Sequence, residues 1–278
     1  MHWSAWRAAG RIAALLPLVL GSGAALAIVS ALPLGDRRLA VSRGLARALA
    51  ERVLRALHVD VQRVGPWPTV PALYVANHLS WLDILVLLVA LPDARLVAKD
   101  EVGRWPLIGA FARAADTIFV ARARRASLPQ TVQAIAARLD ADTPVLLFAE
   151  GTTGDGSEVL PFRSSLFDAA VRTGRPVVPI GLRLRARVGD RAGARLLCWT
   201  GTMSLLRHLP LVAGTRRITS VLRAGAPLSV EPAPALDQRR HRSRVRKRLA
   251  RAAERAVRRL VTPHDDGDPR HDPRLVRP

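Results

Sequence analysis

The chain has 278 residues, of which 49% are hydrophobic and only 4% aromatic, and its 43 lysines and arginines outnumber its 22 acidic residues. This length allows one large domain with an ample, mainly aliphatic core. The single cysteine, Cys198, excludes a disulfide framework and a thiolate metal site, and it favours a reducing, cytosol-facing location. A formal net charge of +21 favours an anionic partner, either a nucleic acid or an anionic membrane surface.

Residues 12–35 contain no charged side chain. As a helix they would be about 36 Å long, which is enough to cross a bilayer. Arginines flank the run, and the larger group after it places the rest of the chain in the cytoplasm. The sequence therefore predicts a membrane helix. Two alternatives are a re-entrant or surface-lying element broken at Pro17, Gly21 or Gly23, and a signal peptide cleaved near Ala27.

Residues 38–57 form the next periodic segment. Apolar residues recur every three or four positions with arginines between them, which is typical of an amphipathic helix with a basic face. Such a helix can lie in the headgroup layer of a membrane or cover the domain as a solvated outer helix. Residues 59–64 then alternate like a strand, and residues 65–68 (GPWP) form a turn.

A group of polar side chains interrupts the most apolar part of the chain at residues 77–83 (NHLSWLD). Residues 72–76 before it are expected to form a buried strand, and residues 84–91 after it an apolar helix that Pro92 ends. A buried polar group costs roughly a few kcal/mol unless it is hydrogen-bonded. These side chains therefore need partners or a chemical role.

His78 and Asp83 within this group have the chemistry of a general base and of the carboxylate that orients it. Five positions apart on one continuous helix, they would point about 140° away from each other. We therefore expect His78 in the loop and Asp83 in the first helical turn, with Ser80 capping the helix. The alternative is a structural His–Asp hydrogen bond.

Strands and helices alternate through the rest of the chain, which predicts an α/β fold with a single largely parallel central sheet flanked by helices, preceded by the N-terminal hydrophobic membrane helix. The expected strands are residues 95–99, 117–121, 144–149, 176–184, 196–201 and 218–222. The expected helices are residues 105–115, 129–139 and 165–173, followed by a short apolar segment at 204–211 and a basic helix at 236–261.

These elements predict three parts of the chain. Residues 1–57 hold the membrane-inserted or anchoring helix and the basic amphipathic helix, and residues 58–261 form the α/β domain with its basic C-terminal helix. Residues 262–278, rich in proline, aspartate and arginine, are expected to be disordered. The basic helix suits anionic lipid or a nucleic-acid backbone. Lipid is the simpler partner because a hydrophobic N-terminal run is already present, so no nucleic acid is expected.

Four blocks of sequence, in order, resemble the motifs of the glycerophospholipid acyltransferases. The first is Asn-His-x4-Asp at residues 77–83, and the others are residues 117–122 (TIFVAR), 148–152 (FAEGT) and 176–179 (PVVP). The likeness covers about residues 60–185. A lone His-x4-Asp is a weak signal, whereas four blocks at compatible spacing are specific. The chain is therefore identified as similar to the 1-acyl-sn-glycerol-3-phosphate acyltransferases.

This resemblance implies a membrane-associated O-acyltransferase, facing the cytoplasm at a bacterial inner membrane, that needs no cofactor and no metal. It implies an acyl chain moving from acyl-CoA or acyl-carrier protein to a lysolipid hydroxyl, with lysophosphatidate as the first expectation. Lyso-ornithine lipid is the alternative acceptor, because residues 150–156 (EGTTGDG) look like a branch that acylates it. Thr153 stands where many members have arginine, and Ala149 replaces a common proline.

The resemblance also implies residue roles beyond His78 and Asp83. Arg122 is the expected ligand of the acceptor's phosphate, because a guanidinium binds phosphate bidentately. The acceptor site is expected to be lined by Asn77, Glu150, Gly151 and Thr152. For Glu150, the alternative is a structural ion pair with an arginine.

Two other functions fit some of the same features. The His–Asp pair could serve a lipid hydrolase with Ser80, Ser164 or Ser165 as nucleophile, although no Gly-x-Ser-x-Gly elbow is present. A non-enzymatic basic protein that binds membranes or nucleic acid could hold the pair for structural reasons.

Overall fold

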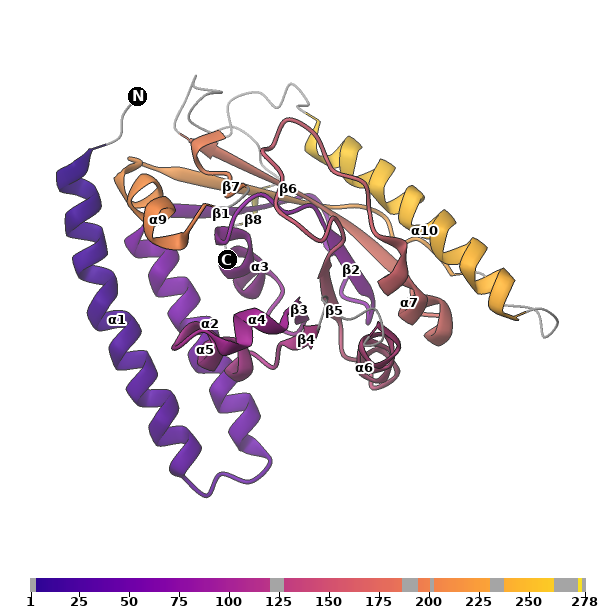
Figure 1. Cartoon of the computed structure of the whole chain (residues 1–278), viewed down its shortest axis with the longest axis horizontal. Coiled ribbons are helices and arrows are strands. Elements are labelled where there is room, and N and C mark those ends of the chain that lie inside the picture. Colours follow the sequence, from indigo (N-terminus) through magenta and orange to yellow (C-terminus); the bar gives the residue numbers. More distant parts are fainter. Residues whose placement is uncertain are drawn as a thin grey trace.

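The computed structural model describes residues 4–120, 128–186, 195–200, 203–230, 238–262 and 275–276. A central sheet lies between two groups of helices, so the chain folds in three layers (Figure 1). The predicted α/β class with a mostly parallel sheet and a long apolar N-terminal helix is confirmed.

The sheet has the strand order β4-β3-β5-β2-β6-β7-β1-β8. Its first five strands run parallel, β7 is antiparallel to β6, β1 is parallel to β7, and the short β8 is antiparallel to β1. The strands are β1 (Val59–Val64), β2 (Leu73–Ala76), β3 (Arg95–Lys99), β4 (Ile118–Val120), β5 (Val145–Phe148), β6 (Val177–Ala186), β7 (Ile218–Ala224) and β8 (Leu275–Val276).

Two hydrophobic cores lie on the two faces of the sheet, because successive side chains of a strand point to opposite faces. In β2, Tyr74 and Ala76 join one core and Leu73 and Val75 join the other. The first core is covered by α1 (Ala5–Ala31), α2 (Arg37–Ala56), α3 (Leu82–Ala90) and α9 (Leu205–Gly214). The second is covered by α6 (Leu128–Asp140), α7 (Asp168–Thr173), the 3-10 turn η2 (Ser164–Phe167) and α10 (Gln238–Val261). We call these the α1 face and the α10 face.

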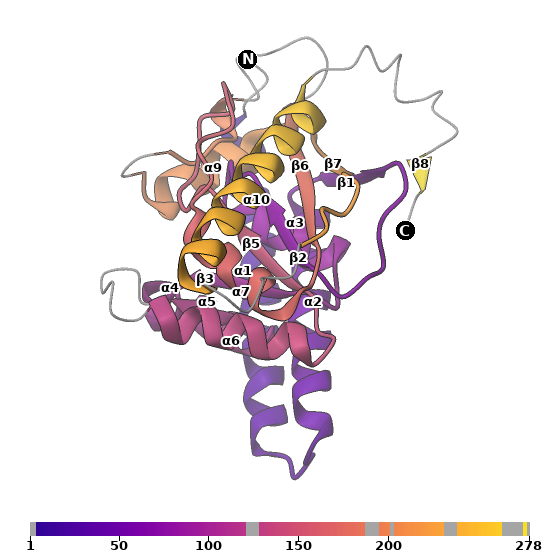
Figure 2. The ribbon, with the colours of Figure 1, turned by 90° about the vertical axis from the view of Figure 1, so that its right-hand side faces the viewer.

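Helix α1 is continuous through Pro17, so the break at its proline or glycines, which was the alternative to a single helix, does not occur. By length and composition it can cross a membrane, yet it packs against α2 and α9. Arg11 fastens its first half to the domain by donating to the carbonyl oxygens of Leu57, Ala213, Thr215 and Arg216 at 2.5–3.1 Å. The hairpin of α1 and α2 projects beyond the sheet (Figure 2).

The helix expected at residues 105–115 is divided into α4 (Asp100–Arg104) and α5 (Ile108–Ala114). Leu107 has a φ of +60° at the start of α5, and Trp105–Leu107 break the helical path. The two short helices meet so closely that a Cβ on Gly109 would lie 2.2 Å from the carbonyl oxygen of Gly103. Only glycine fits at that position.

The prediction of a strand at residues 196–201 is wrong, because the structure describes residues 195–200 and they belong to no strand of the sheet. We call residues 195–200 the strap. Its backbone bonds to the loop after β2 instead, with the amide of Trp199 donating to the carbonyl oxygen of Leu79 at 2.7 Å. Of the tail at 262–278, the structure describes Thr262 and β8; the remainder, predicted to be disordered, lies outside the described residues.

Candidate active site

His78 and Asp83 meet at the carboxyl end of β2, in the middle of the sheet. The Nδ1 of His78 lies 2.9 Å from the Oδ2 of Asp83. His78 is in the loop and Asp83 in the first turn of α3, as the spacing of the two residues predicts. The side chain of His78 is 15% exposed, whereas that of Asp83 is buried completely.

The carboxylate of Asp83 is held by three donors. Besides His78, the backbone amides of Leu79 and Ser80 donate to its Oδ2 at 2.6 Å and 2.8 Å. Because two backbone amides already donate to this oxygen, it is a hydrogen-bond acceptor, and the imidazole nitrogen that faces it must be a donor. The proton of the imidazole is therefore on Nδ1. Its Nε2 keeps the lone pair that a general base needs.

The imidazole ring also rests on Phe148, the last residue of β5. The two ring centroids are 3.8 Å apart and the planes are inclined by 15°. The carbonyl oxygen of His78 accepts a hydrogen bond from the amide of Gly154 at 2.8 Å. The ring and the backbone of His78 are thus both held by β5, which is next to β2 in the sheet, and by the loop that follows β5. Nothing in the sequence marked Phe148 for this task, because its contact depends on the order of the strands.

Asn77 has a position unlike that expected of a substrate-binding residue. Its side-chain amide donates to the carbonyl oxygen of Leu182 at 2.9 Å, and its carbonyl oxygen accepts from the amide of Leu182 at 2.8 Å. Both polar groups are therefore used to fasten the end of β2 to β6, and the side chain is buried. Asn77 positions the loop on which His78 lies.

The predicted cap by Ser80 does not form. No side chain caps α3, and Asp83 instead accepts from the amides of Leu79 and Ser80 in the loop before the helix. The hydroxyl of Ser80 is buried without a hydrogen-bond partner among the described residues. Ser164 and Ser165 lie in η2, whose core residues belong to the α10 face. No serine is thus hydrogen-bonded to His78 within the described part of the chain.

Glu150 lies beyond the end of β5 and is only 3% exposed. Burial raises the pKa of its carboxyl group to about 8, against the opposing effect of the amides of Leu160 and His78. Its Oε2 has no hydrogen-bond partner among the described residues, and no described ion pair supplies the arginine of the structural alternative. At neutral pH this carboxyl group is mostly protonated. It can then donate a hydrogen bond inside the site.

The loop after Glu150 stays beside the catalytic loop, where the amide of Gly154 bonds to the carbonyl oxygen of His78. Gly151 adopts a φ of +74° that favours glycine, and Thr152 is exposed. The hydroxyl of Thr153 donates to the carbonyl oxygen of Trp199, so this side chain fastens the loop to the strap. Arg122, the expected phosphate ligand, lies outside the described residues.

A buried histidine supports the same loop from the α1 face. The indole N–H of Trp81 donates to the Nδ1 of His208 at 2.9 Å. The Nε2 of His208 lies 3.1 Å from the carbonyl oxygen of Leu196 and donates to it. Burial lowers the pKa of His208, so the ring is neutral with its proton on Nε2. Sequence reasoning missed this network, because His208 stands alone in an apolar segment.

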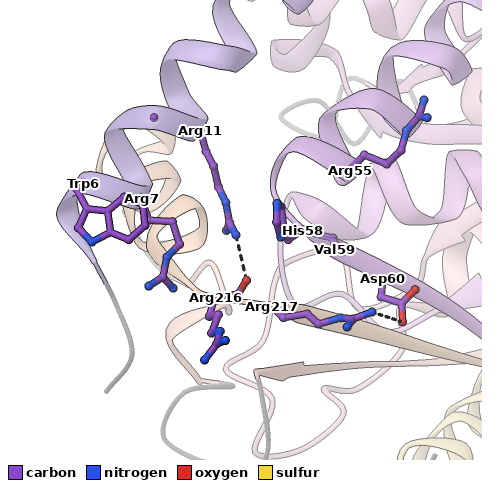
Figure 3. Close-up of a pocket in the computed structure, with 10 residues that line it drawn as sticks. Trp6, Arg7, Arg11, Arg55, His58, Val59, Asp60, Arg216 and Arg217 are labelled. Carbon is purple, nitrogen blue, oxygen red and sulfur yellow. Dashed lines mark hydrogen bonds and ion pairs between the residues drawn. The ribbon is translucent and has the colours of Figure 1, made fainter. Parts of the chain in front are cut away.

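A cleft of about 1230 Å³ lies at the amino-terminal end of α1, and His78 is not among its lining residues. Figure 3 shows Arg11 reaching the carbonyl group of Arg216, and Arg217 pointing to Asp60. The pKa of His58 in this cleft is lowered by burial and then by Arg11, Arg217 and Arg7. The cleft therefore has a positive potential. Its lining residues are Trp6, Arg7, Gly10, Arg11, Arg55, His58, Val59, Asp60, Arg216 and Arg217.

No group of three histidine, cysteine, aspartate or glutamate side chains in the described ranges could hold a metal ion. At the carboxyl edge of the sheet, the oriented imidazole of His78 lies near the buried carboxyl group of Glu150. This arrangement can remove a proton from a hydroxyl group and return it to a leaving group.

Comparison with known proteins gives one family and one fold. The sequence model of the family described as Acyltransferase matches residues 58–183. The chain is 37% identical to a lyso-ornithine lipid O-acyltransferase of Brucella abortus, over 69% of this chain and 71% of that protein. It is 33% identical to the Pseudomonas aeruginosa protein of the same name, over 89% of this chain and 90% of that protein.

A 1-acyl-sn-glycerol-3-phosphate acyltransferase of Neisseria gonorrhoeae is 33% identical over 52% of this chain and 57% of that protein. Among solved structures, the fold is similar to that of the 1-acyl-sn-glycerophosphate (LPA) acyltransferase PlsC from Thermotoga maritima. That likeness has a TM-score of 0.62 at 20% identity, and it covers 91% of this chain and 93% of the other.

Proposed function

The chain belongs to the acyltransferase family, and from that premise we propose that it moves an acyl chain from an acyl thioester to the hydroxyl group of lyso-ornithine lipid. As a lysolipid acyltransferase it takes a lysolipid acceptor and an acyl donor. The observation that carries the acceptor is the likeness to the Pseudomonas aeruginosa protein, which covers 89% of this chain and therefore extends beyond residues 58–183.

Thr153 supports an acceptor without a phosphate group. The resemblance to the acyltransferase motifs implies arginine at this position in many members of the family, and an arginine there could bind a phosphate group. Here the hydroxyl of Thr153 bonds to the strap at Trp199 instead of pointing a positive charge into the site. The ornithine headgroup carries a carboxylate and an ammonium group and so has no net charge, whereas a phosphate headgroup has a net negative charge that favours a positive partner.

Lysophosphatidate is the second candidate acceptor. Its support is the likeness to the Neisseria gonorrhoeae protein, which is 33% identical over about half of each chain. Arg122 is the residue proposed to bind its phosphate, and Gly151 and Thr152 are proposed to line the acceptor site at the exposed end of the loop after Glu150.

The reaction uses His78 as the general base. The Nε2 of His78 takes the proton of the acceptor hydroxyl while the hydroxyl oxygen attacks the thioester carbonyl carbon. Asp83 keeps Nδ1 protonated and stabilises the imidazolium that forms. The tetrahedral intermediate then expels the thiolate, which takes the proton from His78, so that ester and free thiol are the products. A positioned general base contributes about 10²–10⁴-fold to such a step.

Glu150, being mostly neutral near pH 7, serves as a hydrogen-bond donor within the acceptor site. Phe148 and Asn77 act on His78 indirectly. Phe148 fixes the plane of the imidazole, and Asn77 fixes the loop on the sheet.

The enzyme acts at the cytoplasmic surface of a bacterial inner membrane. Because α1 packs along α2 and α9, it lies within one leaflet and does not cross the bilayer. Its outward side chains Leu16, Leu20 and Ile28 are exposed and face the acyl chains. The basic cleft at its amino-terminal end then faces anionic headgroups.

A panel of lysolipids offered to the full chain in vesicles tests this proposal. Lyso-ornithine lipid and lysophosphatidate are each supplied with acyl-CoA and with acyl-carrier protein. The proposal predicts acylated ornithine lipid as the main product. Phosphatidate as the main product would transfer the proposal to the second acceptor, and release of free fatty acid without acylated lipid would overturn both in favour of a hydrolase.

A further inference from the structure

The outer face of α10 carries a line of positive charge. Its inner face buries apolar side chains, among them Val245, Leu249 and Val257, against the sheet. Exposed basic side chains recur every three or four residues on the opposite side, which places them on one helical face about 28 Å long. We call this face the arginine stripe. Its residues are Arg240, Arg244, Lys247, Arg248, Arg251, Arg255 and Arg259.

The stripe is not needed for packing. Five of its members line a shallow depression of about 370 Å³ on the surface, and the only acidic residue of α10, Glu254, is directed elsewhere. Glu254 accepts a hydrogen bond from the amide of Phe162 at 3.0 Å. Like charges one turn apart destabilise a helix, so the stripe weakens α10 until an anionic surface covers it.

A flat membrane that touches α1 does not reach the stripe. The buried side chains of α1, such as Leu15, belong to the core of the α1 face, and those of α10 to the core of the other face. Figure 1 shows α1 and α10 on opposite sides of the sheet, and Figure 2 shows α10 in front when the molecule is turned. The exposed apolar side chains of α1 and the stripe therefore point away from each other.

The carboxyl-terminal end of α10 lies on β6, the strand to which the catalytic loop is bonded. A Cβ on Gly181 of β6 would be 2.5 Å from the Cβ of Leu260, so α10 ends against the strand directly beside Leu182. Leu182 is the residue that Asn77 bonds. A partner bound along the stripe is thus within reach of the loop that carries His78.

These observations favour one kind of partner. We propose that the arginine stripe is the docking surface for an acyl carrier protein, a small acidic protein that presents the acyl thioester on a flexible arm. This proposal rests on the proposed function, since a donor must approach from the side that the membrane leaves free. Complementary charge across such a surface accelerates association and sets its salt dependence. A nucleic acid would match the charge, but it brings no substrate to the site.

Charge reversal on the stripe tests the proposal. The variants are R251E and R244E/R251E in the full chain, reconstituted in vesicles, and the matched control is R52E, an exposed arginine of α2. We expect kcat/KM for acyl-carrier protein to fall about tenfold or more in the double variant. The kinetics with acyl-CoA, which needs no protein docking, stay unchanged, and R52E resembles the wild type with both donors.

Direct titration with holo-acyl carrier protein measures docking without catalysis. If the chain acylates no lysolipid, the proposed function is wrong, but the titration still tests the docking surface. Tighter binding to wild type than to R244E/R251E, weakening with salt, supports the stripe. Equal binding by wild type and variant, or equal losses with both thioester donors, would overturn it. The proposal would also be overturned if the stripe variants lost binding to duplex DNA or to anionic vesicles but kept their affinity for the carrier protein.

Discussion

The two faces of the sheet bury the same kind of side chain but expose opposite kinds. Helix α1 turns an apolar side to α2 and α9, and α10 turns one to the sheet. Outward, α1 exposes Leu16, Leu20 and Ile28, whereas α10 exposes its arginine stripe. The buried sides determine where the helices lie, and the exposed sides indicate what each face meets. A lipid substrate and a soluble donor can then approach the carboxyl edge of the sheet from different sides.

The catalytic loop lies where these faces meet. Asn77 bonds to β6, His78 rests on β5 through Phe148, and the strap bonds to Leu79. Substitutions at the site or on one face should therefore change the property assigned to that part of the molecule and leave the properties of the other face unchanged.

Asp83→Asn is expected to have the largest effect. A neutral amide cannot stabilise the imidazolium of His78, so kcat falls roughly 10³-fold while KM for both substrates changes little. Asp93→Asn is the matched control, because Asp93 is exposed and lies just beyond the other end of α3. Binding of the carrier protein to the stripe stays intact. If Asp83→Asn had the same kcat as Asp93→Asn, Asp83 would have no part in the mechanism.

Glu150→Gln is expected to remove a pH dependence of stability. The carboxyl pKa is raised from 4.5 to about 8 in the folded chain, so the folded state binds more protons than the unfolded state between these values. The free energy of unfolding therefore falls as pH rises from about 4.5 to 8, by roughly 3 kcal/mol at pH 7. Glutamine does not titrate, so the variant loses this decline.

The decline in the free energy of unfolding is measured by urea unfolding at pH 4.5 and at pH 8. Glu158→Gln, a change at an exposed carboxylate, should leave the wild-type difference intact. Parallel pH profiles for wild type and Glu150→Gln would show that the buried carboxyl group is not the source of the decline.

Leu20→Asp with Ile28→Asp is expected to act on the membrane face alone. Both side chains are exposed on α1, and charges there oppose insertion into the acyl layer. The vesicle-bound fraction at equilibrium should fall about tenfold in flotation assays. R251E, on the other face, should float like the wild type. Equal losses of the vesicle-bound fraction in the two variants would mean that both faces contact lipid, which contradicts the assignment of lipid to the α1 face alone.

The strongly patterned elements could be predicted from the sequence. The strand at residues 59–64, the amphipathic helix that follows the apolar run and the loop-and-turn placement of His78 and Asp83 agree with the structure. Each follows from local periodicity or from the geometry of two side chains. The mostly parallel sheet likewise follows from the alternation of strands and helices.

The errors have non-local causes. Residues 195–200 look like a strand, but their backbone groups bond to Leu79 and to the loop at Thr153. The bonds between Asn77 and Leu182 join residues far apart in the chain, so the sequence did not indicate them. Phe148 and His208 support the site through contacts between segments far apart in the chain, and no local pattern reveals such contacts.

The most direct test of the account compares wild type with His78→Ala in the same vesicle preparation. The initial rates of acylated ornithine lipid and of free thiol formation are measured together from lyso-ornithine lipid and an acyl thioester. The account predicts equal rates of the two products in the wild type. It predicts a loss of about 10²–10⁴-fold in both for the variant, whose melting temperature stays close to that of the wild type. A His78→Ala chain that acylates the lysolipid at the wild-type rate would contradict the account.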